Sequence, residues 1–262
     1  MLPDLLRIAI LGGILAVDRV AGWSSMLSQP LVGACLAGAL IRPGPEWELW
    51  ALRVPIAVGA ILQLLLTNSS LPAAQRPHDT AGAGVIGSSV ALLGLARLHP
   101  VLPISAAGLL WVVVGVAAGL LAAVAGGWFA GLSRGAVASA AFRADALADQ
   151  GAIGSFERLY WGGLVRLFLG GALWAWGGTL FLLGLALWFL PYLSEAFTAR
   201  RAGIVFAALL GAGLAAAFHA NVRGRTRGVR WALLGIVVTF LLLRAFHAGA
   251  VDGAGEVPGG AP

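Results

Sequence analysis

The sequence predicts an all-α polytopic membrane protein, in which several transmembrane helices are joined by short re-entrant or broken helices. Hydrophobic residues make up 60% of the 262 residues and charged residues 11%, whereas soluble domains carry about 25% charged residues. Glycine occurs 38 times without a collagen repeat, as expected where small residues let membrane helices pack closely. Most of the chain must therefore face lipid or other helices.

The first two apolar runs are short. Ile8–Val17 and Pro30–Ile41 contain 10 and 12 residues, whereas a helix needs about 20 to cross a bilayer. They predict re-entrant or broken helices, and the alternative is one tilted helix followed by an interfacial one. Arg42–Trp50 contains two prolines and two tryptophans, which favours a turn at the headgroup boundary. Ala51–Leu66 predicts a helix with Pro55 in its first turns.

The next three segments alternate in polarity. Ala81–Ala96 is an apolar run of marginal length, and Val101–Leu132 is long enough for one tilted span. Ser133–Arg158 is polar, with alanine, aspartate and arginine spaced over several turns. We therefore expect it to be a loop with helical character between two membrane segments.

The last third is again apolar. Leu159–Leu193 is interrupted by the pairs Gly170-Gly171 and Gly177-Gly178. Because glycine weakens a helix interior, these pairs favour a helix pair or a broken helix over one very long helix. Ala202–Phe218 and Trp231–Phe246 are the remaining apolar runs. We expect a single integral-membrane domain over residues 1–246 and a disordered tail over 247–262, where glycine, alanine and proline dominate.

The charges indicate topology rather than a nucleic-acid partner. All 17 basic residues are arginine and the net charge is +6, but the arginines lie singly or in short loops beside apolar runs. The densest cluster, Arg223–Arg230, favours a cytoplasmic loop. Cys35 is the single cysteine and the four histidines show no helical pairing, so we expect neither a disulfide within the chain nor a metal site. No P-loop, nucleophile-elbow or zinc-protease motif occurs, and we expect no catalytic residues and no cofactor.

Polar side chains cluster between Gln63 and Asp79, with Asn68 among them and apolar runs on both sides. Ionisable or amide groups near membrane segments are costly, so each is a candidate for function. Converging amides and carboxylates suit sugars, because every hydroxyl group both donates and accepts a hydrogen bond. The alternative is an ordinary solvated loop. Further ionisable groups within or beside the apolar runs are Asp18, Arg19, Arg53, Arg166 and Arg244.

Three patterns occur in a fixed order. They are Asp18 followed by Gln29, Pro30, Leu31 and Val32; Gly59, Leu62 and Gln63 followed by Asp79; and Ala144, Asp145, Ala148 and Gly151, which follow A-D-x-x-A-x-x-G. In these patterns and their spacing, Leu5 to Leu169 resembles the IIC subunit of the mannose/fructose/sorbose class of bacterial phosphotransferase systems.

The resemblance implies an elevator-type transporter subunit of the bacterial cytoplasmic membrane. It implies that the chain binds and translocates a hexose or amino-hexose, with Gln63 and Asp79 as sugar-binding residues and Asn68 as a weaker candidate. The implied partners are a IID membrane subunit and soluble IIA/IIB (IIAB) protein in an oligomeric complex. Phosphoryl transfer would take place on those partners, so the chain itself would not be an enzyme.

Two alternatives remain open at this point. The chain has Ile41-Arg42 where the family has Gly-Asp, and it carries Gln75, Arg76 and His78 in the loop before Asp79. These departures favour a diverged paralogue with a regulatory or structural membrane role and no transport. The other alternative is an unrelated transporter or channel that is rich in small residues.

Overall fold

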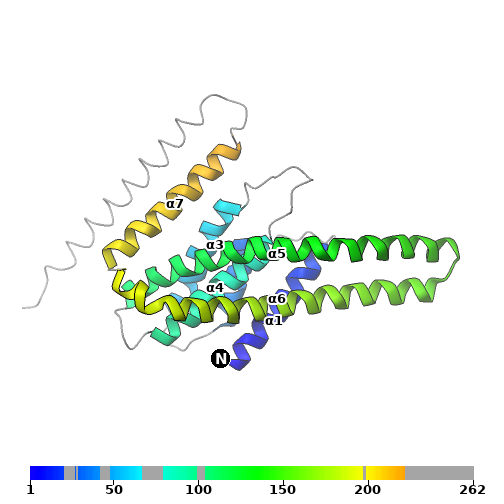
Figure 1. Cartoon of the computed structure of the whole chain (residues 1–262), viewed down its shortest axis with the longest axis horizontal. Coiled ribbons are helices and arrows are strands. Elements are labelled where there is room, and N and C mark those ends of the chain that lie inside the picture. Colours follow the sequence, from blue (N-terminus) through cyan, green and yellow to red (C-terminus); the bar gives the residue numbers. More distant parts are fainter. Residues whose placement is uncertain are drawn as a thin grey trace, which may run out of the picture.

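The computed structural model describes residues 1–20, 27, 29–41, 48–66, 79–98, 104–196 and 199–221. As predicted, all regular structure within these ranges is helical and none of it is a strand. The helices are α1 (Leu2–Val20), α2 (Pro30–Leu40), α3 (Glu48–Leu66), α4 (Thr80–Leu98), α5 (Ile104–Asp149), α6 (Ile153–Ala196) and α7 (Ala199–Asn221), arranged as in Figure 1. Asn68, the apolar run Trp231–Phe246 and the tail at 247–262 lie outside the described residues.

The two N-terminal runs form helices of unequal length. α1 has 19 residues and α2 has 11, which at 1.5 Å per residue makes them about 28 and 16 Å long. α2 begins at Pro30. Proline suits this position because the first N–H groups of a helix have no hydrogen-bond partner within the helix, so the missing N–H of proline costs nothing. At its other end, Nη1 of Arg7 in α1 donates to the carbonyl oxygen of Leu40 at 3.0 Å, and such a cation stabilises a helix C-terminus. α2 is thus a short helix, too short to cross a bilayer alone.

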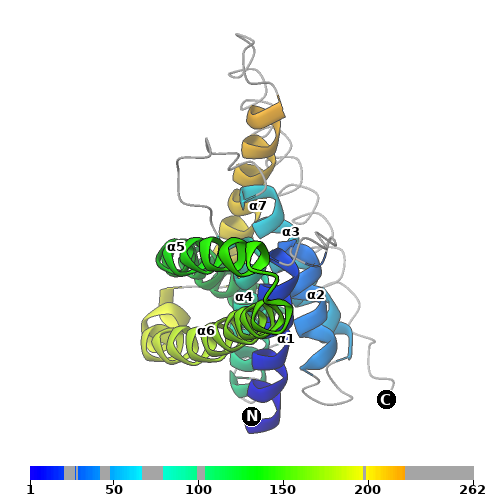
Figure 2. The ribbon, with the colours of Figure 1, turned by 90° about the vertical axis from the view of Figure 1, so that its right-hand side faces the viewer.

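Helix α4 forms the centre of the helical body. It packs along α5 and also contacts α1, α2, α3 and α6, and Figures 1 and 2 show these helices around it. Every residue from Ala83 to Leu95 is buried. A helix that is apolar on all sides is expected to be enclosed by other helices, which explains why this run of marginal length lacks an amphipathic pattern.

Glycines permit the closest helix contacts, as the composition predicts. A Cβ atom added at Gly87 in α4 would lie 2.5 Å from the carbonyl oxygen of Gly115 in α5. Conversely, a Cβ atom at Gly115 would lie 2.7 Å from the carbonyl oxygen of Gly87. The backbones of α4 and α5 are therefore in direct contact, and no larger residue fits at either position without moving a helix.

Helices α5 and α6 differ from the prediction. α6 is one continuous helix of 44 residues, so the expectation of a break at Gly170-Gly171 or Gly177-Gly178 was wrong. The reason is packing, since Gly171 lies against Ala16 of α1 and Gly178 against Ile86 of α4. α5 runs for 46 residues through most of Ser133–Arg158, so the helical character expected of this loop is confirmed and continues without a break from the preceding apolar helix. The two helices form a hairpin that extends beyond the other helices (Figure 1).

The turn of this hairpin explains one of the three sequence patterns. Gly151 has a φ of +66°, in the left-handed region that glycine adopts readily. Its N–H donates to the carbonyl oxygen of Ala148 at 3.0 Å, and the N–H of Ala152 donates to that of Leu147 at 3.0 Å. This pair of hydrogen bonds is a Schellman motif, which ends a helix and satisfies its last carbonyl groups. The glycine of A-D-x-x-A-x-x-G therefore ends α5.

Gly151→Ala is expected to destabilise the hairpin by about 1 kcal/mol, because alanine in the left-handed region costs about 1–2 kcal/mol. No described atom lies within 4 Å of a Cβ placed at Gly151 or at Gly154, so crowding does not contribute at either position. Gly154 lies within α6, and Gly154→Ala should be neutral or stabilising by up to about 1 kcal/mol. Protease cleavage of the hairpin in membranes would measure the difference. Equal cleavage rates in the two variants would contradict the left-handed turn.

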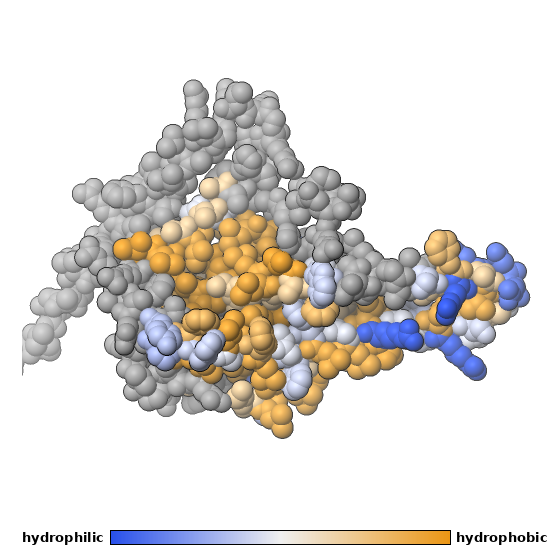
Figure 3. Space-filling model, in the orientation of Figure 1, coloured by the Kyte–Doolittle hydropathy of each residue, from blue (hydrophilic) through white to orange (hydrophobic). Residues whose placement is uncertain are grey.

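Two described helices are long and apolar enough to cross a membrane. They comprise Ala107–Phe129, with 23 residues, and Ile153–Tyr192, with 40. Shorter apolar helical stretches are Pro30–Leu40, Leu52–Leu66, Thr80–Ala96 and Gly203–Ala215. Figure 3 shows hydrophobic residues over much of the helical body and hydrophilic ones gathered at the far end of the hairpin. Exposed apolar surface of this extent is typical of proteins that contact lipid or other subunits.

Candidate functional site

Asp79 lies at the start of the central helix α4, where hydrogen bonds of its side chain and its backbone hold it. Its Oδ1 atom accepts the N–H of Gly82 at 3.0 Å, as an aspartate at a helix N-cap commonly does. Its carbonyl oxygen accepts the N–H of Ala83 at 3.0 Å, and its own N–H donates to the carbonyl oxygen of Ala123 in α5 at 3.1 Å. The carboxylate is thus fixed relative to both α4 and α5.

The second oxygen of this carboxylate, Oδ2, packs closely against two glycines. A Cβ atom at Gly126 of α5 would lie 2.7 Å from Oδ2 of Asp79 and 3.0 Å from Nε1 of Trp174 in α6. A Cβ atom at Gly82 would likewise meet Oδ2 and would lie 3.2 Å from Nε1 of Trp174. The carboxylate of Asp79 and the indole N–H of Trp174 therefore pack against the same two glycines, where α4, α5 and α6 meet.

Gln63 lies in the last turn of α3, beside the start of α2. Its Oε1 atom accepts the N–H of Leu31, in the first turn of α2, at 3.4 Å. Gly59 lets α3 approach α2, because a Cβ atom there would lie 2.9 Å from Cα of Leu31 and 2.7 Å from Cβ of Ala34. The amide of Gln63 is partly buried and lies beside a helix N-terminus, where backbone N–H groups lack partners within the helix.

The first turns of α2 and α4 contact each other, and this contact brings the two predicted residues into one region. A Cβ atom at Gly84 would collide with the carbonyl oxygen of Pro30, and one at Gly33 would lie 3.3 Å from the carbonyl oxygen of Ala81. Gln63 is bonded to the first turn of α2 and Asp79 to that of α4. Helix N-termini carry a partial positive charge, so an amide, a carboxylate and two such termini are grouped here.

The other candidates from the sequence are placed differently. Asp18 is buried, with 6% of its surface exposed. It lies one turn after Leu15 in α1, and Cδ1 of Leu15 would lie 3.6 Å from a Cβ atom added at Gly33 of α2. Arg53 and Arg166 are exposed, as expected for arginines that extend their charge away from an apolar helix. No group of three metal-ligating side chains occurs among the described residues.

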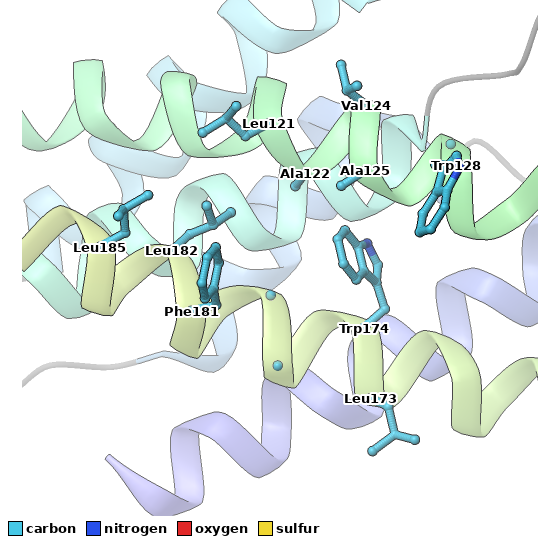
Figure 4. Close-up of a pocket in the computed structure, with 13 residues that line it drawn as sticks. Leu121, Ala122, Val124, Ala125, Trp128, Leu173, Trp174, Phe181, Leu182 and Leu185 are labelled. Carbon is cyan, nitrogen blue, oxygen red and sulfur yellow. The ribbon is translucent and has the colours of Figure 1, made fainter.

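An apolar groove of about 980 Å³ runs between α5 and α6 (Figure 4). Its described lining residues are Leu121, Ala122, Val124, Ala125, Gly127, Trp128, Leu173, Trp174, Gly177, Gly178, Phe181, Leu182 and Leu185. None of these residues is ionisable. The ring of Trp174 points from α6 toward α5 in Figure 4, and its centroid lies 5.0 Å from that of Phe129. Trp174 therefore lines the groove, and its Nε1 atom packs against Gly82 and Gly126 beside Asp79.

Trp174 was not predicted from the sequence. Its Nε1 atom packs against Gly82 near the start of α4, and nothing in the local pattern distinguishes Trp174 from the other tryptophans of the same apolar run. Comparison with known protein families, curated proteins and solved structures found no match to this chain.

Proposed function

We propose that this chain is the membrane-embedded IIC (permease) subunit of a mannose-class, phosphoenolpyruvate-dependent sugar phosphotransferase system. It binds a hexose or amino-hexose and moves it across the bacterial cytoplasmic membrane, which it crosses several times. A IIB partner then phosphorylates the sugar, so the chain itself transfers no phosphoryl group. The observation that carries this proposal is the grouping of Gln63 and Asp79 at the contacting first turns of α2 and α4.

The chemistry of this region suits a sugar. A hydroxyl group donates one hydrogen bond and accepts others, and the region offers carboxylate and amide oxygens as acceptors and an amide nitrogen as a donor. Short helices whose N-termini meet inside a helical body are also typical of substrate sites in secondary transporters. α2 has only 11 residues, and the first turn of α4 is enclosed by α2, α5 and α6. These features support a binding site within the membrane body.

The outer surface supports embedding and assembly with a IID subunit. Along α6, Leu173, Phe181 and Trp188 are 65%, 71% and 72% exposed. Side chains of this size are rarely exposed together on a protein that meets only water. In the proposed complex, lipid and the IID subunit cover this face, and the polar end of the hairpin lies outside the hydrocarbon region. An elevator-like motion of a transport unit against a scaffold follows from the proposed family.

Sugar uptake by the reconstituted system tests the proposal. The chain is assembled in membranes with its IID and IIAB partners, and phosphoenolpyruvate-dependent uptake is measured for mannose, fructose, sorbose, glucosamine and N-acetylgalactosamine. We expect uptake of at least one sugar, and no uptake when IIAB is omitted. Absence of uptake from a complex that is shown to be assembled would overturn the transport function and favour a diverged paralogue with a regulatory or structural role.

A further inference from the structure

The groove between α5 and α6 suits an apolar chain rather than a sugar. Its described lining residues carry no ionisable, hydroxyl or amide side chain, whereas sites for polar small molecules place a few such groups among the apolar ones. The polar atom of Trp174, Nε1, is buried and packs against Gly82 and Gly126. The groove therefore offers its occupant mainly hydrophobic and dispersion contacts.

The groove opens sideways, onto the surface that faces hydrocarbon when the chain is embedded in a bilayer. It lies between Ala107–Phe129 and Ile153–Tyr192, the two described helical stretches that are long and apolar enough to cross a membrane. Among its lining residues, Val124 is exposed and Ala122 is buried. The groove is thus a furrow in the outer surface of the helical body, with an exposed rim and a buried floor.

The length of the groove matches the hydrocarbon of one lipid leaflet. Along α6 its lining extends from Leu173 to Leu185, which at 1.5 Å per residue is about 18 Å. The hydrocarbon core of a bilayer is about 30 Å thick, so one leaflet contributes about 15 Å. The volume of about 980 Å³ is at the upper end of the usual range for ligand sites. An extended acyl chain of one leaflet therefore fits along the groove.

An exposed arginine lies beyond one end of the groove, on the same side of α6. Arg166 precedes Leu173 by seven residues and Gly177 by eleven, so the three lie on one helix face. The Cα atoms of Arg166 and Leu173 are about 10 Å apart along the axis. Arg166 forms no ion pair with another described residue. A Cβ atom at Gly170, between them, would meet no described atom within 4 Å, so the path from the guanidinium group to the groove is open there.

We propose that the groove binds one acyl chain of an anionic phospholipid and that Arg166 binds the phosphate group of the same lipid. A guanidinium group binds phosphate through charge-assisted hydrogen bonds, and an arginine at the edge of an apolar span extends to the interface where lipid phosphates lie. The net charge of +6 also favours anionic lipids. This inference goes beyond the proposed function, since it depends on embedding in a bilayer and not on sugar transport.

Quenching of tryptophan fluorescence by lipids with brominated acyl chains tests the proposal, because bromine quenches the indoles that the acyl chain contacts. The full chain is reconstituted in phosphatidylcholine vesicles that contain a small, equal fraction of brominated phosphatidylglycerol or brominated phosphatidylcholine. Every protein is measured with and without Trp174→Phe, and the difference reports on the groove. We expect phosphatidylglycerol to bind about fivefold more tightly, as for one arginine beside an anionic lipid.

Two substitutions separate the phosphate from the acyl chain. Arg166→Gln should abolish the fivefold preference and leave quenching by phosphatidylcholine unchanged, whereas Arg158→Gln, which is also exposed but nearer the hairpin turn, should keep the preference. Gly177→Leu places a side chain in the groove and should lower quenching by both lipids. A Cβ atom at Gly177 would meet no described atom within 4 Å, so this variant should fold. Gly184→Leu is its matched control, because Gly184 has the same open surroundings in α6 and does not line the groove.

The outcomes separate the inference from the proposed function. Equal quenching by the two lipids in wild type, or an unchanged preference in Arg166→Gln, would overturn the inference. Unchanged quenching in Gly177→Leu would do so too. The absence of any quenching that depends on Trp174 in an inserted chain would show that another segment or a partner protein fills the groove. In each case the proposed function stands if uptake is intact, and it fails by itself if the assembled complex takes up none of the sugars.

Discussion

Sugar uptake by the assembled complex is expected to fall by about 10- to 100-fold when Asp79 is replaced by alanine, because a hydrogen bond to a charged group contributes about 1.5–3 kcal/mol. The same change removes the acceptor of the Gly82 N–H at the start of α4, and loss of such a cap costs about 0.5–2 kcal/mol of stability. Asp79→Ala alone therefore does not separate a role in binding from a role in folding.

Asp79→Asn makes this separation. Asparagine caps a helix as well as aspartate does, so the hydrogen bond to Gly82 is kept, while the charge is lost and one oxygen becomes an amide nitrogen. We expect a complex that assembles normally and takes up almost no sugar, measured as phosphoenolpyruvate-dependent uptake per inserted chain. Asp149→Asn is the matched control, since Asp149 is exposed near the hairpin turn. Uptake at the wild-type level by Asp79→Asn would show that Asp79 only caps α4.

Gln63→Ala should also abolish uptake while leaving membrane insertion intact. Its Oε1 atom accepts the N–H of Leu31 at 3.4 Å, a long hydrogen bond whose loss has little effect on folding. Normal uptake by both Gln63→Ala and Asp79→Asn would remove the proposed site.

Much of the fold follows from the apolar runs, and the two differences have different causes. Paired glycines in Leu159–Leu193 predicted a break, since each glycine weakens a helix interior by about 1 kcal/mol. In the structure Gly171 and Gly178 lie against α1 and α4, so contacts with other helices offset that cost. Such tertiary contacts are not visible in the sequence. Ser133–Arg158, expected to be a loop with helical character, is helix except at its turn, because no proline interrupts it and its residues favour helix up to Gly151.

The sequence likewise predicted only part of the candidate site. Gln63 and Asp79 were predicted from local signals, namely polar groups flanked by apolar runs and a resemblance carried by neighbouring residues. Trp174 gives no such signal, because Trp161 and Trp176 in the same run are 63% and 42% exposed and share its composition and surroundings in the sequence. Only the packing of α6 on α4 and α5 selects the tryptophan that faces the carboxylate.

The largest effect on folding is expected from Gly84→Ala. A Cβ atom at this position would collide with the carbonyl oxygen of Pro30, and it would lie 2.8 Å from Cα of the same proline. These atoms belong to the backbone of the first turn of α2, which cannot rotate away as a flexible side chain can. Overpacking of this kind costs about 3 kcal/mol at the upper end of the usual range. We therefore expect α2 to be forced away from α4.

Unfolding of the purified chain in detergent, followed by circular dichroism during titration with sodium dodecyl sulfate, measures this destabilisation. Gly184→Ala is the matched control, because Gly184 lies within α6 and no described atom comes within 4 Å of a Cβ atom there; it should be neutral or stabilising by up to about 1 kcal/mol. Wild-type stability of Gly84→Ala would contradict the contact between α2 and α4.

The same substitution connects the fold to the site. Displacing the first turn of α2 moves Leu31 away from Gln63 and separates the two helix starts that hold the candidate sugar-binding residues. Gly84→Ala should therefore lose both stability and uptake, whereas Asp79→Asn should lose uptake alone. If Gly84→Ala lowers stability by the expected amount but leaves uptake per folded chain unchanged, the sugar does not bind between the first turns of α2 and α4.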